Sequence, residues 1–401
     1  MQKFLKRGVA PAVLMIAMAS ANSAMAQDVT IDIGGRLMLD QAFTDIKNIG
    51  GTGEDLSVTS SEVRRARLFA KGQFSSSVKY KFEFNHTTGG DIEVTDGLLE
   101  FKPKGSNFKI KAGHFKTHNS LEEEASSRFI TTIERGAFTD AFGFDRRLGV
   151  SVGTAGDNYT LNVGVYGESI NDDGRNKDGF AAAARATFAP IKTDETVVHL
   201  GASWRYRDAG SGENDLRYRQ RPYAHSLDSD NTDGFLPSGR IVNAGRFPAD
   251  RDERFAESDN LFAIEGLAIH NGFWAAAEYS LVAANGRDDN EDADFSGGYI
   301  EAGYIFGGRR SYKSSGGTYD RMKVYNPLGE GGLGALSLVA RYDTLDLEDN
   351  GYLGKLDTIV LGVDWLPTKH TRLRVNYFNA DAEDGFADSA SGINARLGFD
   401  F

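Results

Sequence analysis

Basic side chains recur at alternate positions in several short segments of this chain, and such groups can hold anions. In the run Arg64-Arg65-Ala66-Arg67, alternation puts Arg65 and Arg67 on one face of an extended segment and turns Arg64 to the other, unless a bulge intervenes. Guanidinium and ammonium groups fixed side by side bind oxyanions through charge-assisted, often forked hydrogen bonds. We expect an anion-binding wall built from Arg65 and Arg67 together with Arg36, Lys79, Lys81, Lys109, Lys111, Arg205, Arg207, Arg372 and Arg374.

Acidic residues share these faces, among them Asp32, Glu83 and Glu301. If they pair with the bases, the wall has mixed charge and no preference for anions. Anion preference is the interpretation we adopt, and the mixed wall is its alternative.

A second group of charges lies in residues 116–145, a segment too long for a turn and less polar than an exposed loop. Its apolar side chains, such as Leu121 and Phe138, would be buried if the segment folded inward against the strands. That placement would make it a constriction loop that brings its charges to the narrowest point of a pore. The charges concerned are Lys116, Glu122, Arg128, Glu134 and Arg135. The alternative is an exposed loop that contacts a neighbouring subunit.

The sequence offers little for catalysis, cofactors or metals. His114, His118 and Ser120 form the only close cluster of its kind, and they leave a predicted strand rather than lie on a helix. The chain contains no Cys, which excludes thiolate chemistry and Cys-ligated metal sites. We therefore expect no enzyme activity, no cofactor and no metal. The net charge of −12 argues against a nucleic-acid partner.

The first 26 residues have the pattern of a secretory signal. Lys3, Lys6 and Arg7 precede an apolar run, and Ala24-Met25-Ala26 offers a cleavage site. The apolar run is too short to span a bilayer, so we predict cleavage before Gln27 and one domain over residues 27–401.

The elements that must position the charges are strands. Alternating or apolar stretches recur sixteen times, an even number that suits a bacterial outer-membrane barrel. Even-numbered connections are short and odd-numbered ones are mostly long, as expected for periplasmic turns and external loops. One connection, residues 309–332, breaks this rule: it is either a periplasmic excursion or a missed strand pair. The predicted strands are 29–44, 60–74, 77–87, 92–103, 106–117, 146–154, 158–170, 178–190, 195–208, 259–270, 272–284, 296–308, 333–346, 354–366, 370–380 and 390–401.

The two faces of these strands need different surroundings. One row reads Val78, Tyr80, Phe82 and Phe84, whereas the intervening residues are mostly charged. A charge facing lipid costs ~2–4 kcal/mol at the bilayer midplane, so the charged rows must face water. We predict an all-β fold, a transmembrane antiparallel barrel of about 16 strands with an aqueous lumen and an inward-folded loop.

The last strand and one long loop bear on the surroundings of the barrel. The alternating strand that ends at Phe401 resembles the sorting signal of Gram-negative outer-membrane barrels, which indicates the outer membrane as the location. Residues 209–258 mix several arginines with acids. We expect that loop to be a solvated surface that contacts lipopolysaccharide. The alternative is a basic outer mouth that gathers anions.

Several motifs resemble the phosphate-selective porin O and P family. They are Glu62-Val63-Arg64-Arg65-Ala66-Arg67-Leu68, Gly113-His114-Phe115-Lys116, Ser120-Leu121-Glu122-Glu123, Ser126-Ser127-Arg128, Ile133-Glu134-Arg135, Arg146-Arg147-Leu148-Gly149-Val150, Gly308-Arg309-Arg310-Ser311-Tyr312, Ala340-Arg341-Tyr342 and Leu345-Asp346-Leu347. The resemblance implies a sixteen-stranded barrel, usually a homotrimer, that passes phosphate or polyphosphate along a ladder of arginines and a ring of lysines. By the same resemblance, Arg64, Arg65 and Arg67 match the arginine wall, and Lys116, Arg128 and Arg135 match the constriction loop.

We therefore expect passive diffusion of small hydrophilic solutes through an anion-preferring pore in the outer membrane. A weakly selective general pore is one alternative. A non-conducting barrel that serves as an adhesion or phage-binding surface is another. A barrel hydrolase is a third, and it would need a Ser and a His side by side on the lipid face.

Overall fold

The computed structural model describes residues 29–86, 90–171, 178–211, 215–227, 239–244 and 254–401. The predicted signal segment, residues 1–26, lies outside this part of the chain. Within the described residues no helix is both long and apolar enough to cross a bilayer.

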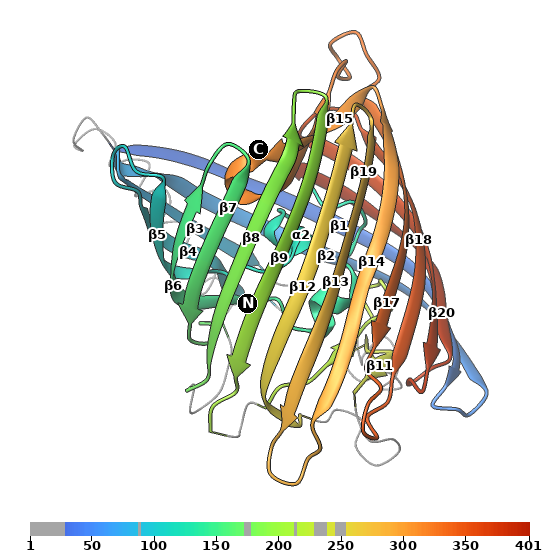
Figure 1. Ribbon diagram of the computed structural model, residues 1–401. Helices are drawn as coiled ribbons and strands as arrows, with labels where there is room; N and C mark the ends of the chain where they lie inside the picture. Colours follow the sequence, from blue (N-terminus) through green and yellow to red (C-terminus); the bar gives the residue numbers. More distant parts are fainter. Residues whose placement is uncertain (1–28, 87–89, 172–177, 212–214, 228–238, 245–253) are drawn as a thin grey trace, which may run out of the picture.

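Sixteen antiparallel strands close into one barrel, as predicted (Figure 1). Each strand pairs with its neighbour in the ring, and β1 pairs with β20 to complete the closure. The wall strands are β1 (Thr30–Ile49), β2 (Glu54–Ser75), β3 (Val78–His86), β4 (Ile92–Phe101), β5 (Phe108–Lys116), β6 (Arg146–Ala155), β7 (Tyr159–Tyr166), β8 (Phe180–Lys192), β9 (Thr196–Asp208), β12 (Ala256–His270), β13 (Phe273–Gly286), β14 (Ala293–Phe306), β17 (Ala335–Asp346), β18 (Lys355–Leu366), β19 (Thr371–Glu383) and β20 (Ser389–Asp400).

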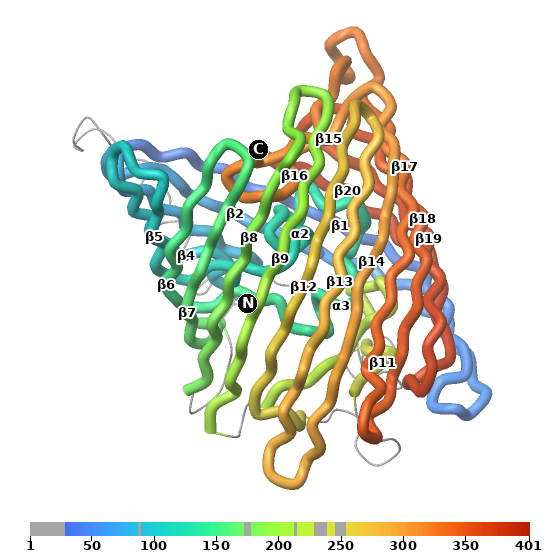
Figure 2. The backbone as a smooth tube through the Cα atoms, in the orientation of Figure 1, coloured from blue at the N-terminus to red at the C-terminus, as the bar shows by residue number. Residues whose placement is uncertain are grey.

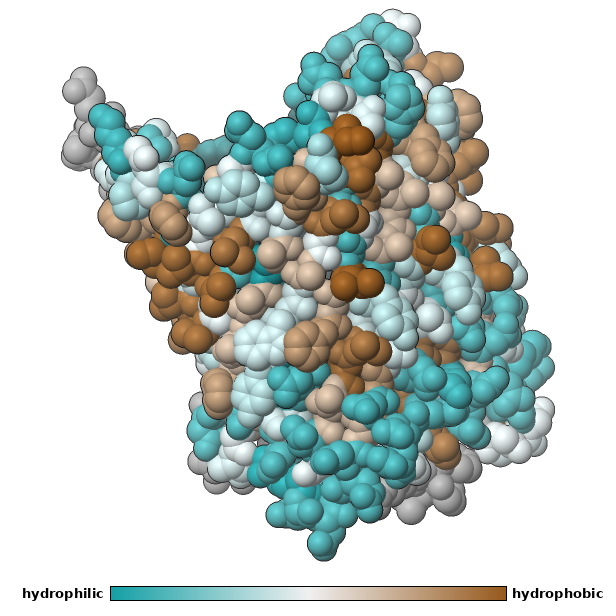
Figure 3. All heavy atoms as spheres, viewed as in Figure 1, coloured by the Kyte–Doolittle hydropathy of each residue, from teal (hydrophilic) through white to brown (hydrophobic). Residues whose placement is uncertain are grey.

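Alternation along the strands separates an apolar outer wall from a polar interior. In β7, Leu161 and Val163 are about half exposed on the outside, whereas Thr160 and Asn162 are buried inside. Figure 3 shows the result as a brown and pale band across the middle of the outer wall, between teal ends. The period-two pattern of the sequence therefore corresponds to the two sides of the wall.

The two ends of the barrel differ in their connections. Short turns join β2 to β3, β6 to β7 and β12 to β13 at one end, which we call the short-turn end. Long segments join β5 to β6, β7 to β8 and β9 to β12 at the other, the long-loop end. In outer-membrane barrels the short turns face the periplasm and the long loops face outward.

The segment between β5 and β6, residues 117–145, folds into the barrel and is called the inward loop below. It contains two short helices, α2 (Leu121–Glu124) and α3 (Ala137–Ala141), which lie within the outline of the wall in Figure 2. Phe138 and Phe142 are fully buried there, against Tyr299 and Tyr218. Burial of these apolar side chains inside the wall agrees with the inward position predicted from the sequence.

Residues 309–332 proved to be neither a wall strand pair nor a simple excursion. Most of them form a hairpin, β15 (Gly308–Lys313) and β16 (Thr318–Val324), that pairs only with itself and lies apart from the barrel sheet. The tip of the hairpin reaches the inner wall, where Arg185 donates hydrogen bonds to the carbonyls of Gly316 and Gly317 at 3.0 and 2.7 Å. The connection is long because it fills part of the lumen.

The loop of residues 209–258 also folds inward where it is described, so the prediction of a solvated surface was wrong for this part. A short pair of strands, β10 (Arg219–Gln220) and β11 (Val242–Asn243), is buried. Tyr218 Oη donates to Asp259 on the wall at 3.1 Å. Composition alone did not reveal these aromatic and carboxylate contacts, because they join segments far apart in the sequence.

Candidate functional site

Two polar cavities lie inside the barrel along β1 to β6. The large cavity, of about 710 Å³, lies toward the short-turn end and reaches the hairpin at Lys313 and Arg321. The small cavity, of about 410 Å³, lies toward the long-loop end and reaches Asn171 and His225. The inward loop, the hairpin and the 209–258 loop fill the opposite side of the lumen with an apolar core.

Four arginines line both cavities and therefore lie where the two meet. They are Arg65 and Arg67 of β2, Arg135 of the inward loop and Arg146 of β6, and we call them the arginine waist. No acidic side chain lines both cavities among the described lining residues, so the charged side chains common to the two are all basic, and acids beside the waist pair with three of them. A permeating anion would meet these groups in succession.

Arg65 differs from the other members of the waist because it has no ion pair among the described residues. Its side chain is largely buried, and its Nε has no hydrogen-bond partner there. Arg67, by contrast, donates to Glu83 and Asn85, and Arg146 donates to Asp96. Of the four guanidinium groups in the waist, that of Arg65 therefore has the fewest hydrogen-bond partners among the described residues.

The prediction that Arg64 turns outward was wrong, because a β-bulge intervenes. In the pairing of β1 with β2, Met38 lies opposite Arg65 and Leu39 lies opposite Val63, so Arg64 is the extra residue. Its side chain lines the small cavity and makes a two-point ion pair with Glu134, at 2.9 and 2.8 Å. The bulge therefore brings Arg64, Arg65 and Arg67 all to the interior.

Glu134 holds the inward loop to two strands. Besides Arg64, the Arg396 guanidinium of β20 donates to its carboxylate at 2.8 Å. Burial alone would raise the pKa of Glu134, but the two guanidinium groups hold that pKa well below its usual range. Glu134 is therefore ionised at neutral pH, and it neutralises much of the charge of Arg64.

Lysines of the predicted wall divide between the large cavity and the remainder of the lumen. Lys81 and Lys111 line the large cavity, whereas Lys79 and Lys109 line neither cavity among the described residues. Lys81 forms ion pairs with Glu83 and Asp96, and Lys111 forms none within the described part of the chain. Arg36 also lines the large cavity, where it donates to Glu83 at 2.7 Å and to Ser127 at 2.9 Å.

Four other arginines predicted to line the wall instead make contacts within the fold, three of them with the inward loop and Arg207 with a neighbouring wall strand. Arg205 donates to the carbonyls of Phe142 and Gly143, and Arg207 pairs with Asp259. Arg374 donates to the carbonyls of Ile130 and Thr132, and Arg372 to that of Arg128. None of the four lines either cavity among the described residues. Alternation predicted which side of the wall they face, but not which folded segment would cover them.

The charges of the inward loop have different partners. Glu122 is fully buried against Arg341 at 2.6 Å, away from both cavities. Lys116 and Arg135 both pair with Glu123, at 3.2 and 3.0 Å, at the edge of the waist. Arg128 faces the large cavity and also donates to Asp400 at 3.0 Å.

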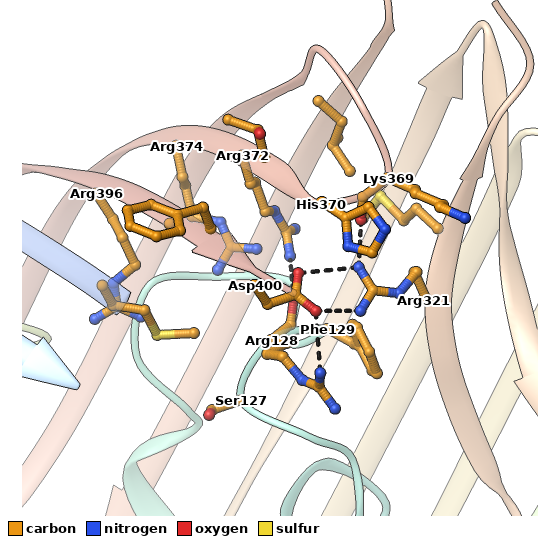
Figure 4. A pocket seen from close by; sticks show the side chains of 16 residues that line it. Ser127, Arg128, Phe129, Arg321, Lys369, His370, Arg372, Arg374, Arg396 and Asp400 are labelled. Atoms are coloured by element: carbon orange, nitrogen blue, oxygen red, sulfur yellow. Dashed lines mark hydrogen bonds and ion pairs between the residues drawn. The ribbon is translucent and has the colours of Figure 1, made fainter. Parts of the chain in front are cut away.

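Asp400 lies in a small pocket beside the large cavity, surrounded by cations (Figure 4). Arg128 of the inward loop and Arg321 of the hairpin both bind its carboxylate, so three elements meet at this residue. Arg146, Arg321, Arg341 and Arg396 were not predicted as site residues. Arg146 and Arg341 lie in motifs that carry the family resemblance, and Arg396 alternates with the apolar row of the last strand, so these three could have been found from the sequence.

No group of three or more His, Asp or Glu side chains with the geometry of a metal site occurs in the described part of the chain.

Comparison with known proteins identifies a family and relatives that are similar to this chain. The model of the family described as phosphate-selective porin O and P matches residues 31–401. Porin O of Pseudomonas aeruginosa is 28% identical over 377 residues, which cover 89% of this chain and 81% of that protein. A Caulobacter vibrioides protein described as uncharacterized is 31% identical over 334 residues, 79% of this chain and 62% of its own length. The chain thus spans less than two thirds of that relative.

Solved structures share the fold at low sequence identity. A loop-deletion form of the outer-membrane protein OmpT of Vibrio cholerae superposes with a TM-score of 0.56 at 14% identity, covering 94% of this chain and all of that one. An anion-selective porin from Comamonas acidovorans gives a TM-score of 0.53 at 11% identity, covering 93% of this chain and all of that one.

Proposed function

This chain belongs to the phosphate-selective porin O and P family, and we propose that it forms an anion-preferring diffusion pore, with phosphate or polyphosphate as its natural anion. As a member, it is an outer-membrane β-barrel porin, a channel rather than an enzyme. The proposal concerns what passes through it, and the arginine waist is the observation that carries it.

The waist supports anion preference for a simple electrostatic reason. Fixed positive groups where the two cavities meet raise the local concentration of anions and repel cations. Arg65 adds a positive charge that no acid among the described residues pairs with, and its side chain lines both cavities. Arg67, Arg135 and Arg146 each pair with an acid. The preference for anions therefore depends on the charge of Arg65, unpaired among the described residues, and on the excess of bases around the large cavity. A weakly selective pore would need acids that balance this excess as well.

Single-channel recording in planar bilayers tests this function. The purified protein should conduct steadily in KCl, and inorganic phosphate should reduce the chloride current in a concentration-dependent way. Sulfate, added at the same concentration of negative charge as the phosphate, is the matched control anion. A barrel that inserts but never conducts would support the adhesion alternative, and conduction without any phosphate block would limit the proposal to general anion diffusion.

We further propose that three copies assemble as a homotrimer in the outer membrane, with lipid and lipopolysaccharide as surroundings. A structure of OmpT from Vibrio cholerae is described as a trimer form, which supports a trimer here by analogy of fold. Native mass spectrometry in detergent should give three times the mass of the mature chain. N-terminal sequencing of the same sample should begin at Gln27 if residues 1–26 are removed.

A further inference from the structure

The two cavities carry different fixed charge, although they meet at one waist. Among the described residues, twelve Lys and Arg side chains and four Asp and Glu side chains line the large cavity. Six basic and five acidic side chains of the same described residues line the small cavity. Without the four shared arginines, the small cavity keeps two bases, Arg64 and Arg221, against five acids, whereas the large cavity keeps eight bases against four acids.

Ion pairing within the wall does not remove this difference. Lys111 and Lys313 line the large cavity and form no ion pair among the described residues, so their charges face the water. Glu93 lines the small cavity and likewise has no ion pair in the described part of the chain. Arg64, one of the two bases of the small cavity outside the waist, is already paired with Glu134. Three of the five acids of the small cavity likewise form ion pairs, namely Glu123, Glu134 and Asp140. A strongly basic compartment and a nearly balanced compartment therefore lie in series.

The topology gives these compartments a direction in the membrane. The large cavity is bounded by the hairpin and by Lys81, near the short β2–β3 turn, so it opens toward the periplasm. The small cavity is bounded by Asn171 and by residues 220–225 of long connections, so it opens outward.

From this arrangement we infer that the pore is a rectifier, which carries more current when the external side is positive than when it is negative. The inference rests on the proposed function, since it requires that ions pass through the two cavities. It concerns the direction of conduction, which anion preference alone does not fix.

The physical reason lies in where mobile ions collect. Anions are the majority carriers in the large cavity, whereas the nearly balanced small cavity admits anions and cations alike. When the external side is positive, anions move outward and cations move inward, so both accumulate at the waist and conductance rises. The opposite polarity draws both away from the waist and depletes it. Salt screens fixed charge, with a Debye length of about 10 Å at 0.1 M and about 3 Å at 1 M, so rectification should fade as salt increases.

Current–voltage curves of single channels in symmetric KCl test the inference. At 0.1 M salt the current should be about twofold larger with the external side positive, and at 1 M the curve should approach a straight line. Each channel is recorded separately, so opposite insertions give mirror-image curves. Since the chain has no Cys, a Ser76→Cys variant in the exposed β2–β3 turn, labelled with a bulky maleimide from one bath, identifies the periplasmic side.

Two sets of variants locate the cause. Lys111→Gln with Lys313→Gln removes unpaired charge from the large cavity and should reduce the current ratio toward one, as should Glu93→Gln in the small cavity. Lys102→Gln with Lys104→Gln removes the same charge from an exposed turn that lines neither cavity, and should leave the ratio unchanged.

The outcomes separate this inference from the proposed function. No conduction, or cation selectivity, would overturn the proposed function. A straight current–voltage curve at 0.1 M salt in an anion-selective pore would overturn rectification alone. Rectification that survives in the cavity variants would show that the charges named here do not cause it.

Discussion

At the scale of single residues, the charged side chains inside this barrel are of two kinds. Some line a cavity and can contact ions, and others form buried hydrogen bonds that hold the fold together. Arg65 and Lys111 have no ion pair among the described residues and line a cavity. Arg205 and Arg374 are fully buried and donate to backbone carbonyls of the inward loop. Both kinds look alike in the sequence, because each lies on the inner face of a strand.

Replacing Arg65 should weaken anion preference. Arg65→Ala removes one positive charge from the waist without leaving an acid unpaired, so we expect a roughly two- to fivefold fall in the anion-to-cation permeability ratio. Bi-ionic and gradient potentials measure that ratio. Arg309→Ala, in the hairpin but outside both cavities, is the matched control. An unchanged ratio in Arg65→Ala would place selectivity elsewhere.

Glu122 should contribute to stability rather than to selectivity. Its carboxylate pairs with Arg341 at 2.6 Å and accepts the Gly136 N–H at 2.9 Å, in a fully buried setting. Glu122→Gln leaves Arg341 with one carboxylate instead of two, which should lower the free energy of unfolding by about 3 kcal/mol.

Urea unfolding in detergent micelles, followed by tryptophan fluorescence, measures this change. Asp55→Asn breaks the exposed pair with Lys47 and should not move the midpoint. If the two variants unfold at the same urea concentration, the buried pair with Arg341 does not stabilise the fold as we describe.

At the scale of elements, the hairpin β15–β16 and the inward loop divide the lumen. The hairpin is held by Arg185, by contact of Tyr312 Oη with His199 at 2.8 Å, and by Arg321 at Asp400. It contributes no strand to the wall. The wall should therefore close without it.

Deleting the hairpin should enlarge the pore. Replacing residues 309–323 by a short turn removes Lys313, Thr318 and Tyr319 from the lining of the large cavity, so single-channel conductance should rise and larger solutes should pass. Liposome swelling with sugars of increasing size measures the size limit. Shortening the β13–β14 connection at residues 287–292 is the control deletion. A pore of unchanged conductance and size limit would mean that the hairpin does not narrow the path.

The sequence predicted the wall well and the contents of the barrel less well, for a physical reason. All sixteen wall strands could be predicted from alternation, since each strand has one face toward lipid and the other toward the lumen. Arg64 was misplaced because a bulge inserts one residue, and nothing local to Arg64 indicates it. The roles of Arg205 and Arg374 depend on a loop that meets them only in the folded barrel. Tertiary contacts of this kind have no period in the sequence.

At the scale of the whole molecule, the barrel presents an apolar wall to lipid and an asymmetric, charged interior to water. Large apolar side chains such as Ile264 and Ile300 are about two thirds exposed on the outer wall. This explains how a chain that is only 40% hydrophobic can lie in a membrane, because only alternate residues of each strand meet lipid.

A charge on the outer wall should therefore impair assembly. Ile264→Lys, near the middle of β12, should cost about 2–4 kcal/mol in the bilayer and lower the yield of folded barrel in lipid vesicles. Folding is read from the heat-modifiable shift on gel electrophoresis. Asp289→Lys, in an exposed connection, adds the same residue without meeting lipid. Equal yields from the two variants would contradict the membrane position of the wall.

The central claim is that ions cross this barrel through an arginine waist, and the reversal potential in a tenfold KCl gradient tests it most directly. We predict a reversal potential of the sign that chloride movement sets, which means that chloride permeates better than potassium. A potential of the sign set by potassium would contradict the account.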